Sequence, residues 1–547
     1  MALGDSLPAV ATFSLVEAYV LQRIVFDDKA FHIVCLGVLG VNFLLKACFS
    51  ITIWPFLLSP LRHLPKVPGS HAQLVFDSPR GTKPLIWMKT IPNEGLLHLR
   101  DTFNQSYVLP TNHQALLDVM STNTYDFEKP WRARNFLARI IGFGMITSEG
   151  AAHKKQRKAL TPAFNIKNIR SMYSLMWNKT GQLLDEMEKD IKNHPMEGTS
   201  PEDQVGKIEM SEWASRLTLD IIGPIAMGRD FGSLHNKQNK IAESFARILE
   251  PTKEKLAFLV MNFTLPQWIA RRVPWRMNGV LNTETAYLRS TCDEIVREKR
   301  GSLAESKMSA QELEADILGT MMLGGDFSDA ELVDQMLTFL AAGHETTASA
   351  LTWACYLLHL HPEYQTRLRN EIRAQIPSGD SPITYQDLEH LPLLNGVCQE
   401  VLRLYPTVPT TLREAVQNTV MAGKYIPKGT RVVICPWAIN RSPLFWGDNG
   451  EDFVPERWID TDKNGNSIPN NNGGASTNFA QITFLHGQRS CIGKDFARAE
   501  LRCAIAGVVG RFAFEMQDPK QEIHVSGAVT IKPVEGMHLK MHRVDEW

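Results

Sequence analysis

The stretch FLHGQRSCIG, from Phe484 to Gly493, decides the fold of this chain of 547 residues. It places Cys491 two residues after Arg489 and directly before an apolar helical pattern. The N–H groups and the dipole at a helix N-terminus favour the thiolate of a nearby cysteine. Gly487 and Gly493 allow a flat body to press against the loop, and the arginine offers a fork suited to a carboxylate. The stretch therefore predicts a thiolate beneath a flat group that bears a carboxylate.

This stretch resembles the signature F-x-x-G-x-R-x-C-x-G of the cytochrome P450 superfamily. All five fixed positions match, at Phe484, Gly487, Arg489, Cys491 and Gly493. The resemblance implies a mainly α-helical fold with small β-sheets that binds haem b in this loop, with the Cys491 thiolate as the axial ligand of the iron. The alternative is a buried structural cysteine before a helix, which leaves the arginine and both glycines unexplained.

A second family element lies upstream of the cysteine. Glu400 and Arg403 form an E-x-x-R pair, and the stretch FVPERW supplies Arg457. The resemblance implies that these three residues form a structural ion-pair network that supports the haem-side core. A Glu/Arg pair at this spacing is most often a solvated contact worth about 0.2–0.5 kcal/mol. Its place on an apolar helix that ends at Pro406 favours the network.

A third element, AAGHETTAS, lies in a long apolar helix that begins with a capping box at Ser328. It matches the family pattern [A/G]-G-x-[D/E]-T, with Glu345 and Thr346 as the last two residues. The resemblance implies that Thr346 orients a water or the distal oxygen and that Glu345 helps to deliver protons, so both are predicted catalytic residues. Ala342 and Gly343 would leave room for a diatomic ligand. The alternative is a threonine that bonds back to its own helix.

One family element departs from its usual form. The stretch SEGAAHKKQRKALTPAF resembles the helix whose W-x-x-x-R residues contact a haem propionate, but His153 stands where tryptophan is commonest, while Arg157 keeps the arginine. A histidine ring nitrogen can still donate a hydrogen bond to a carboxylate. Arg413, which follows the proline-rich turn YPTVPTTL, is a further candidate for propionate binding.

The resemblance implies a haem-thiolate monooxygenase that inserts one oxygen atom of O2 into a lipophilic small molecule, by hydroxylation, epoxidation or oxidative rearrangement. The sequence has no flavin or nicotinamide fingerprint, so electrons are expected from a separate NADPH-cytochrome P450 reductase, with cytochrome b5 as an optional second donor. In overall style the chain is similar to fungal microsomal members of secondary metabolism. Two alternatives stay open: a haem-thiolate isomerase or dehydratase without oxygen activation, and a non-catalytic membrane-bound haem sensor.

Composition argues against several other classes. The 58 basic and 59 acidic residues nearly cancel, so nucleic acid is not an expected partner. The eight cysteines have no C-x-x-C pair or regular spacing. This distribution argues against a disulfide framework and a zinc site, and it fits a reducing compartment.

The N-terminal region predicts a membrane anchor. Residues 31–59 form an apolar run with Lys46 as its one charge, long enough to cross a hydrocarbon core of about 30 Å. The run begins far from Met1 and lacks a preceding basic region and a small-residue cleavage site, so a retained anchor is favoured over a cleaved signal peptide. Acidic residues prevail before the run, whereas Arg62 and Lys66 follow it, and the positive-inside rule then puts the rest of the chain in the cytosol.

These features divide the chain into four parts. They are a lumenal segment at 1–30, a transmembrane anchor at 31–59, a proline-rich linker at 60–70 and a haem-thiolate catalytic domain at 71–547. The predicted location is the endoplasmic reticulum membrane, as a single-pass protein with a cytosolic catalytic domain.

Three segments lie outside these motifs. Residues 256–275 mix aromatic side chains with Arg271 and Arg272, and they fit an interfacial membrane contact and a core helix with its loop about equally. The patch at 462–478, rich in asparagine and glycine, is expected to be an exposed loop. The charge-rich segment 292–317, like the histidines outside the motifs, is expected to be solvated surface.

Overall fold

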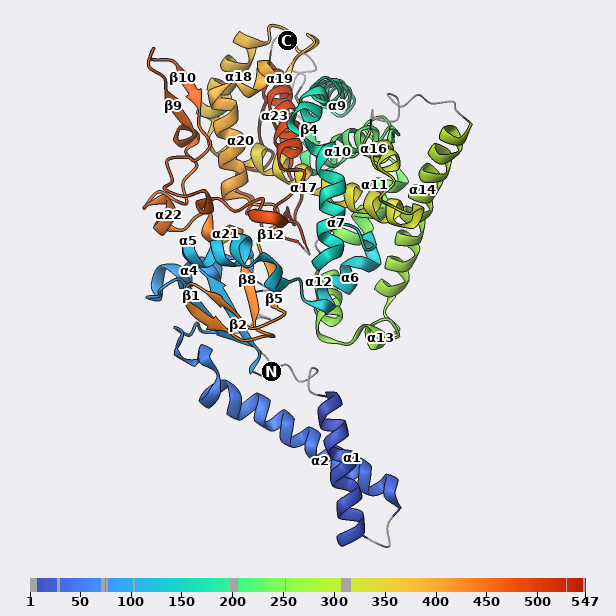
Figure 1. Cartoon of the computed structure of the whole chain (residues 1–547). Coiled ribbons are helices and arrows are strands. Elements are labelled where there is room, and N and C mark those ends of the chain that lie inside the picture. The colour runs from blue at the N-terminus through green and yellow to red at the C-terminus, as the bar shows by residue number, and fades with distance from the viewer. Residues whose placement is uncertain are drawn as a thin grey trace.

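The structure, a computed structural model, describes residues 7–26, 30–69, 74, 77–101, 104–196, 205–250, 252–305, 316–527, 529–544 and 547. Helices dominate these residues, and the strands described there form five small sheets. The predicted mainly α-helical fold with small β-sheets is therefore confirmed (Figure 1).

The N-terminal elements are α1 (Leu7–Ile24), α2 (Phe31–Cys48), its continuation as a π-helix η2 (Phe49–Leu58), and η3 (Pro60–His63). The longer helices that follow are α4 (Thr82–Thr90), α6 (Trp131–Ile141), α7 (Gly150–Leu160), α9 (Tyr173–Asn193), α10 (Met210–Met227), α11 (Lys240–Leu249), α12 (Lys253–Thr264), α14 (Arg276–Ala304), α16 (Ile317–Gly324), α17 (Asp329–Leu360), α18 (Pro362–Gln375), α20 (Pro392–Leu404) and α23 (Lys494–Arg511). The short helical turns are α5 (His113–Leu117), η5 (Asp118–Thr122), η6 (Thr124–Asp126), η7 (Thr161–Phe164), α8 (Ile166–Ser171), α13 (Gln267–Ala270), α19 (Tyr385–Glu389), α21 (Pro436–Ile439), α22 (Pro443–Trp446), η9 (Pro455–Trp458), η10 (Asn478–Ala480) and η11 (Gly487–Arg489).

Helix α17 runs through the core for 32 residues, as its length and apolar composition predict. The capping box is present at its start, where the Ser328 hydroxyl accepts from the Glu331 N–H at 3.4 Å and the Glu331 carboxylate accepts from the Ser328 N–H at 2.8 Å. The helix ends at Leu360, with His361 as its C-cap residue directly before Pro362. Its middle packs against α10 and α23, which brings the AAGHETTAS stretch beside the cysteine loop.

The largest sheet has the strand order β1–β2–β8–β5–β3. Its strands are β1 (Leu96–Arg100), β2 (Ser106–Pro110), β8 (Arg431–Ile434), β5 (Thr411–Ala415) and β3 (Phe127–Glu128). Only β2 and β8 pair in parallel among them. The other sheets join β11 (Phe512–Met516), β14 (His538–Arg543) and β4 (Val205–Glu209), and pair β6 (Thr419–Met421) with β7 (Lys424–Ile426), β9 (Ile459–Thr461) with β10 (Ser467–Pro469), and β12 (Val525–Ser526) with β13 (Lys532–Pro533).

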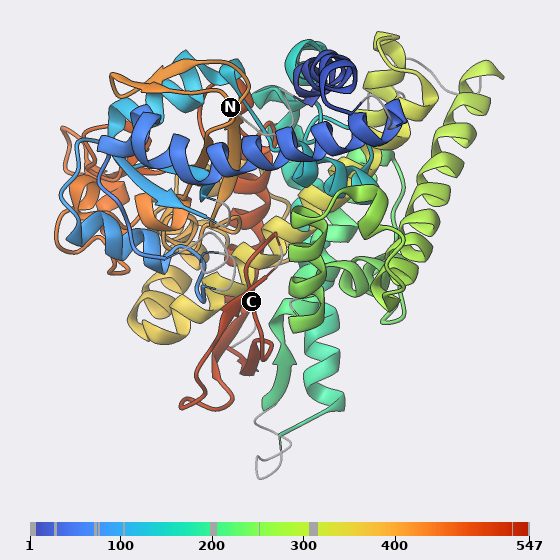
Figure 2. The ribbon, with the colours of Figure 1, turned by 90° about the horizontal axis from the view of Figure 1, so that it is seen from below.

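The predicted membrane anchor is a continuous helix. Within the described residues, Phe31–Leu58 is the one helix long and apolar enough to cross a membrane by itself, and it is almost wholly exposed. Figure 1 shows this helix and α1 below the rest of the molecule, and Figure 2, seen from below, shows it lying across the molecule with α1 almost end-on beside it. Residues 7–24 of the expected lumenal segment therefore form a helix of their own.

Three expectations about surface segments are wrong in part. Lys299 and Asp316, both in the charge-rich segment, form a buried ion pair, while residues 306–315 lie outside the described residues. The patch at 462–478 contributes strand β10, which pairs with β9. Among the histidines outside the motifs, His98 is only 1% exposed because β1 lies inside the molecule.

Candidate active site around the cysteine loop

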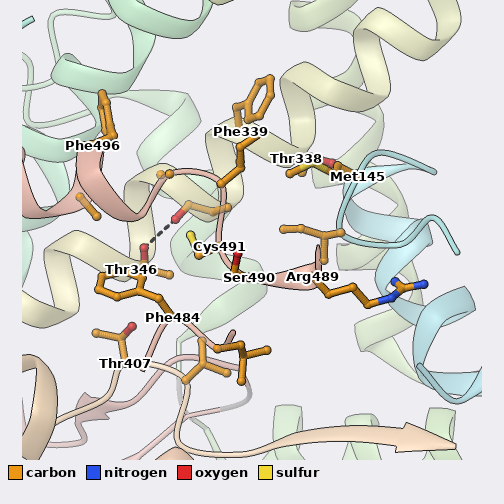
Figure 3. A pocket seen from close by; sticks show the side chains of 18 of the residues that line it. Met145, Thr338, Phe339, Thr346, Thr407, Phe484, Arg489, Ser490, Cys491 and Phe496 are labelled. Atoms are coloured by element: carbon orange, nitrogen blue, oxygen red, sulfur yellow. Dashed lines mark hydrogen bonds between the residues drawn. The ribbon is translucent and has the colours of Figure 1, made fainter. Parts of the chain in front are cut away.

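Cys491 lies in the turn between η11 and α23, at the edge of an internal cavity of about 320 Å³. The loop is closed by a hydrogen bond from the Cys491 N–H to the Phe484 carbonyl at 2.9 Å. The thiol is exposed to this cavity although protein atoms surround it on all sides. Figure 3 shows its sulfur beside Thr346 and Phe484, with the Arg489 side chain extending away from it.

Burial raises the pKa of the Cys491 thiol, although the Gly493 N–H and the Arg157 guanidinium both act to lower it. The prediction that the helix terminus favours the thiolate is therefore outweighed by desolvation in the protein alone. A metal cation at the sulfur adds the positive charge that deprotonates a coordinating thiol.

The two glycines of the loop have different roles. Gly487 has a φ of +68°, and a Cβ there would lie 2.0 Å from the backbone carbonyl oxygen of Met120 in η5. This glycine is needed because two backbone segments touch, rather than to admit a flat ligand. Gly493 lines the cavity, and its nearest neighbour to an added Cβ is Phe164 at 3.9 Å. Gly493 thus lies, as predicted, at a position where a flat group could approach the loop.

Helix α17 supplies the opposite wall of the cavity. The Thr346 hydroxyl donates to the Ala342 carbonyl at 2.7 Å, drawn as the dashed line in Figure 3. Its oxygen lone pairs stay available to accept a hydrogen bond from a water or ligand. Gly343 also lines the cavity, but a Cβ there would lie 2.8 Å from the Ile222 side chain on α10. Close packing of α10 on α17 therefore explains Gly343 as well as the predicted space for a small ligand does.

Glu345 is buried and forms an ion pair with Lys532 of β13 at 2.7 Å. Desolvation acts to raise the pKa of the Glu345 carboxyl, but Lys532 and His344 outweigh it, and the pKa lies below its usual range. His344 itself is fully buried, and its Nε2 lies 2.6 Å from the Ser215 hydroxyl. The acid of the AAGHETTAS stretch is thus held as a carboxylate by a lysine from the C-terminal part of the chain.

Positive charge is concentrated along one end of the cavity. Among the described residues that line it, Lys129, Arg157, Arg413 and Arg489 are basic, and none is acidic. Glu149, at the start of α7, contacts Arg489 and lies 3.7 Å from the Lys129 amine. Four cations against one carboxylate leave an excess of buried positive charge.

The surroundings of these cations confirm that their charge is poorly compensated. Desolvation and the neighbouring Arg413 lower the pKa of Lys129 to about 7, and burial lowers the pKa of Arg413 to about 10. Arg489 Nε has no hydrogen-bond partner among the described residues. Arg157 donates to the Ser490 carbonyl at 2.5 Å, so it also fixes the residue next to the cysteine. Two carboxylates at this end of the cavity would balance the charge.

His153 lies on α7 beside the same cations and is 4% exposed. Burial and the charge of Arg489 lower its pKa to about 3, so the ring is neutral at physiological pH. Its Nδ1 lies 3.2 Å from the Tyr125 hydroxyl. His153 lines the cavity, as predicted, and as a neutral ring it has one N–H to donate.

This arrangement fits a haem group. A soft ligand faces an internal cavity, and buried cations without enough counter-charge lie where the two propionates of a haem would need them. Comparison with known proteins supports the same conclusion, because the model of the family Cytochrome P450 matches residues 102–539.

The chain belongs to the cytochrome P450 family.

Several of its relatives are fungal. Cytochrome P450 monooxygenase sphH of Aspergillus fumigatus is 38% identical over 515 residues, which cover 92% of each chain. Cytochrome P450 monooxygenase ALT8 of Alternaria alternata is 35% identical, with coverage of 90% of this chain and 92% of the relative. Cytochrome P450 monooxygenase FUM15 of Gibberella moniliformis is 34% identical, with coverage of 91% and 90%. The chain is thus an oxidoreductase of the haem-dependent monooxygenase type.

The predicted ion-pair network of this P450 is fully assembled. The Arg403 guanidinium donates to both oxygens of the Glu400 carboxylate at 2.7 Å, and neither side chain is exposed. Arg457 donates to the same carboxylate at 3.0 Å. Arg403 also donates to the backbone carbonyls of Asn440, Gly450 and Asp452, which ties α20 to the segments before η9. The alternative of a solvated surface pair is therefore wrong for this pair.

A second cavity of about 350 Å³ adjoins the first and shares Lys129, Ala342 and Thr346 with it. Most of its wall is apolar and comes from α6, α12, α17 and the large sheet. The apolar residues include Ile140, Ile141, Leu249, Leu259, Phe263, Leu412, Val433 and Val529. In this P450 the second cavity lies beyond Thr346 as seen from the cysteine loop. Its apolar lining thus suits a lipophilic molecule.

Four residues of the site were not predicted from sequence: Lys129, Glu149, Lys532 and Trp458. The Trp458 indole donates to Glu400 at 2.8 Å, next to the predicted Arg457. Glu149 is the N-cap residue of α7 and has no motif of its own. Only the tryptophan of FVPERW offered a sequence signal, because it directly follows the predicted arginine.

Proposed function

We propose that this P450 inserts one atom of O2 into a lipophilic small molecule, as a hydroxylation, epoxidation or oxidative rearrangement. The observation that supports this most is the apolar cavity of about 350 Å³ that meets the cysteine cavity at Thr346. Bound haem supplies the O–O bond cleavage, which a thiolate ligand favours by donating electron density to iron. The protein supplies the ligand, the binding site and the protons.

Several residues would hold the cofactor. Cys491 would be the axial ligand of haem b, with Phe484 and Gly493 at the same face. Arg157, Arg413 and Arg489 would bind the propionates, with His153 as a neutral donor. Lys129 joins this set because its amine lines the cavity beside Arg413 and is poorly compensated.

Thr346 and Glu345 would handle protons on the opposite face. The Thr346 hydroxyl donates a hydrogen bond to the Ala342 carbonyl. Its oxygen is therefore positioned to accept a hydrogen bond from a water at the reacting end of the substrate cavity. Glu345 lines that cavity and is held as a carboxylate by Lys532, whose side chain is 18% exposed. Lys532 would thus link the buried acid to solvent, from which each consumed proton is replaced.

Electrons would come from a separate NADPH-cytochrome P450 reductase, with cytochrome b5 as an optional second donor. The sequence offers no flavin or nicotinamide fingerprint. We expect the protein in the endoplasmic reticulum membrane with its catalytic domain on the cytosolic face. The fungal origin of the relatives supports a role in secondary metabolism.

Segment 256–275 would touch the same membrane. Both interpretations made from its sequence apply to parts of it. Leu259 and Phe263 line the substrate cavity, as a core helix would, whereas Trp268 of α13 is 65% exposed, as a membrane contact requires. Trp131, at the start of the neighbouring α6, is 60% exposed. Figure 1 places α13 at the end of the molecule from which the anchor projects. Exposed tryptophans at this end fit the membrane interface and would direct lipophilic substrates into the cavity.

The cofactor assignment is tested by a carbon monoxide difference spectrum of the reduced, full-length protein in microsomes. We expect the spectrum of a thiolate-ligated haem from the unchanged chain and its complete loss from Cys491→Ala. Cys503→Ala, a buried cysteine on α23, serves as the matched control and should keep the spectrum. An unchanged spectrum in Cys491→Ala would refute the assignment.

The reaction type is tested by adding NADPH, a reductase and a panel of lipophilic compounds to those microsomes. A monooxygenase consumes NADPH and O2 and yields a product heavier by one oxygen. A haem-thiolate isomerase or dehydratase would instead convert a peroxide or an oxime without NADPH. A haem sensor would bind haem and give no product from any compound.

A further inference from the structure

Helices α1 and α2 pack against each other through small and polar side chains. Ser14 and Ala18 of α1 are fully buried and lie one helical turn apart. Small residues at this spacing let two helix backbones approach closely, which is how helices associate within a bilayer. The Asn42 amide of α2 donates to the Ser14 hydroxyl at 3.0 Å and to the Glu17 carboxylate at 2.7 Å. Ser14 and Glu17 of α1 thus point at α2.

Most of the remaining surface of α1 is apolar and exposed. Its large exposed hydrophobic side chains, which are 47% to 75% accessible, are Phe13, Leu15, Val16, Tyr19, Val20 and Ile24. Thr12 and Arg23 are also exposed, and the Thr12 hydroxyl donates to the Pro8 carbonyl of the same helix. Such a continuous apolar surface is not stable against water. The neighbouring Phe31–Leu58 helix has the same property and is the predicted membrane span. The exposed apolar surface of α1 is therefore continuous with the exposed apolar surface of the membrane span.

Length and charge of α1 are compatible with the bilayer interior. Its 18 residues extend about 27 Å at 1.5 Å per residue, close to the hydrocarbon thickness of about 30 Å. Glu17 and Arg23 are its only charged residues. Glu17 is paired with Asn42, and Arg23 stands in the last turn, from which it can reach the headgroups. A helix that lies on the membrane surface would instead carry a strongly charged face.

The path of the chain requires the two helices to run in opposite directions. Only residues 25–30 connect Ile24 to Phe31. Figure 1 shows α1 beginning at the end nearer the catalytic domain and finishing at the far end, where α2 begins and returns. The Arg100 guanidinium of β1 donates to the Pro55 carbonyl at 2.7 Å, which ties the end of the returning helix to the large sheet.

We propose that α1 and α2–η2 form a two-span membrane hairpin, with lipid acyl chains covering the exposed face of α1. The N-terminus then lies on the same side of the membrane as the catalytic domain, and residues 25–30 lie on the opposite side. This arrangement replaces the single-pass topology and the lumenal position of residues 1–30 that the sequence suggested. It does not rest on the proposed reaction.

Topology is tested by N-glycosylation of the full-length protein in microsomes. One variant carries a flexible insert with an Asn-x-Thr acceptor ahead of Met1, and a second carries the same insert between Phe26 and Ala30. The hairpin predicts glycosylation of the inner insert only. Native acceptor sequences at Asn104, Asn178, Asn262 and Asn440 report the side of the catalytic domain and should stay unmodified.

Every other pattern overturns the hairpin. Glycosylation of both inserts would show a single span with a lumenal N-terminus, and glycosylation of neither would show that α1 does not cross. Modification of the outer insert alone would also exclude the proposal. Protease treatment of sealed microsomes provides an independent readout, because an epitope ahead of Met1 should be removed without detergent.

The lipid partner is tested with microsomes that contain photoactivatable acyl chains. We expect lipid adducts at Phe13, Val16 and Val20 and none at the buried Ala18, which is the matched control position. Absence of lipid adducts at Phe13, Val16 and Val20, or an adduct at Ala18 as abundant as theirs, would overturn the assignment to lipid.

Discussion

Gly487 and Gly493 look equivalent in the signature, but they meet different surroundings. A methyl group at Gly487 would collide with the Met120 carbonyl oxygen at a backbone φ of +68°, which side chains rarely tolerate. A methyl group at Gly493 meets only the Phe164 ring at 3.9 Å. The first glycine thus serves the protein fold, whereas the second leaves space in the cavity where we propose that the cofactor binds.

Gly487→Ala is therefore expected to destabilise the protein even without haem, by at least about 1–3 kcal/mol from backbone strain. Gly493→Ala should leave the stability of the haem-free protein within about 0.5 kcal/mol of the original and lower its haem occupancy. Urea unfolding of protein produced without haem, together with the haem content after reconstitution, measures both effects. Equal losses of stability in the two variants would contradict this division.

Lys532 controls Glu345 by charge rather than by contact with substrate. In Lys532→Met the lysine no longer opposes desolvation, so the pKa of the Glu345 carboxyl should rise above its usual range. The fraction of consumed NADPH that appears as product should fall, by about 10²-fold if proton transfer becomes limiting. Because a raised pKa requires a higher pH for ionisation, the acidic limb of the pH profile should move to higher pH.

Lys532→Arg is the control, since it retains the charge and should restore the original pH profile. A purely structural role for Lys532 predicts lower enzyme yield in Lys532→Met with an unchanged profile. That outcome would remove the lysine from the proposed proton path.

At the scale of elements, α20 and η9 are joined through one buried carboxylate. Glu400 accepts from Arg403, Arg457, Trp458 and the Val454 N–H. Because these groups approach from two segments, the carboxylate fixes how the segment after α20 lies against the helix. Removing its charge leaves two arginines without a counter-ion in the interior.

Glu400→Gln is expected to cost about 3–5 kcal/mol of the free energy of unfolding, as measured by urea denaturation of the haem-bound protein. Asp293→Asn breaks an exposed ion pair with Arg297, whose atoms are 3.1 Å apart, and should change stability by less than about 1 kcal/mol. Similar effects of the two substitutions would mean that the network does not support the core.

The molecule as a whole buries two histidines that do not line the cysteine cavity. Desolvation lowers the pKa of His98 in β1 to about 4 and that of His344 in α17 to about 4. In the unfolded chain these histidines become protonated below about pH 6.5. In the folded chain they stay neutral until the pH falls to about 4. Stability conferred by the neutral rings is therefore present above pH 6.5 and is lost as the pH falls.

Each of these histidines should contribute up to about 1.4 kcal/mol of lost stability per pH unit between pH 6.5 and 4. His98→Gln and His344→Gln should make the free energy of unfolding less steep in this range, as measured by urea denaturation at several pH values. A slope that is unaffected by both buried substitutions would assign the acid sensitivity to other groups.

The sequence by itself determined the elements and the cysteine loop. Five signature residues fall within ten positions, so their spacing could be read without a structure. The ends of α17 and α20 follow from a capping box and from prolines, which act within a few residues along the chain. Local signals of this kind also placed Glu345, Thr346 and the Glu400–Arg403 pair.

Only the tertiary structure decided which groups meet those residues. Lys532 reaches Glu345 from β13, and Lys129 joins the basic end of the cavity from the turn before α6. The contact of α1 with α2 also escaped the sequence, because a run of apolar residues specifies burial without naming the surface that covers it. Partners of buried charges and of apolar faces are chosen by packing between distant segments, and no local pattern encodes that choice.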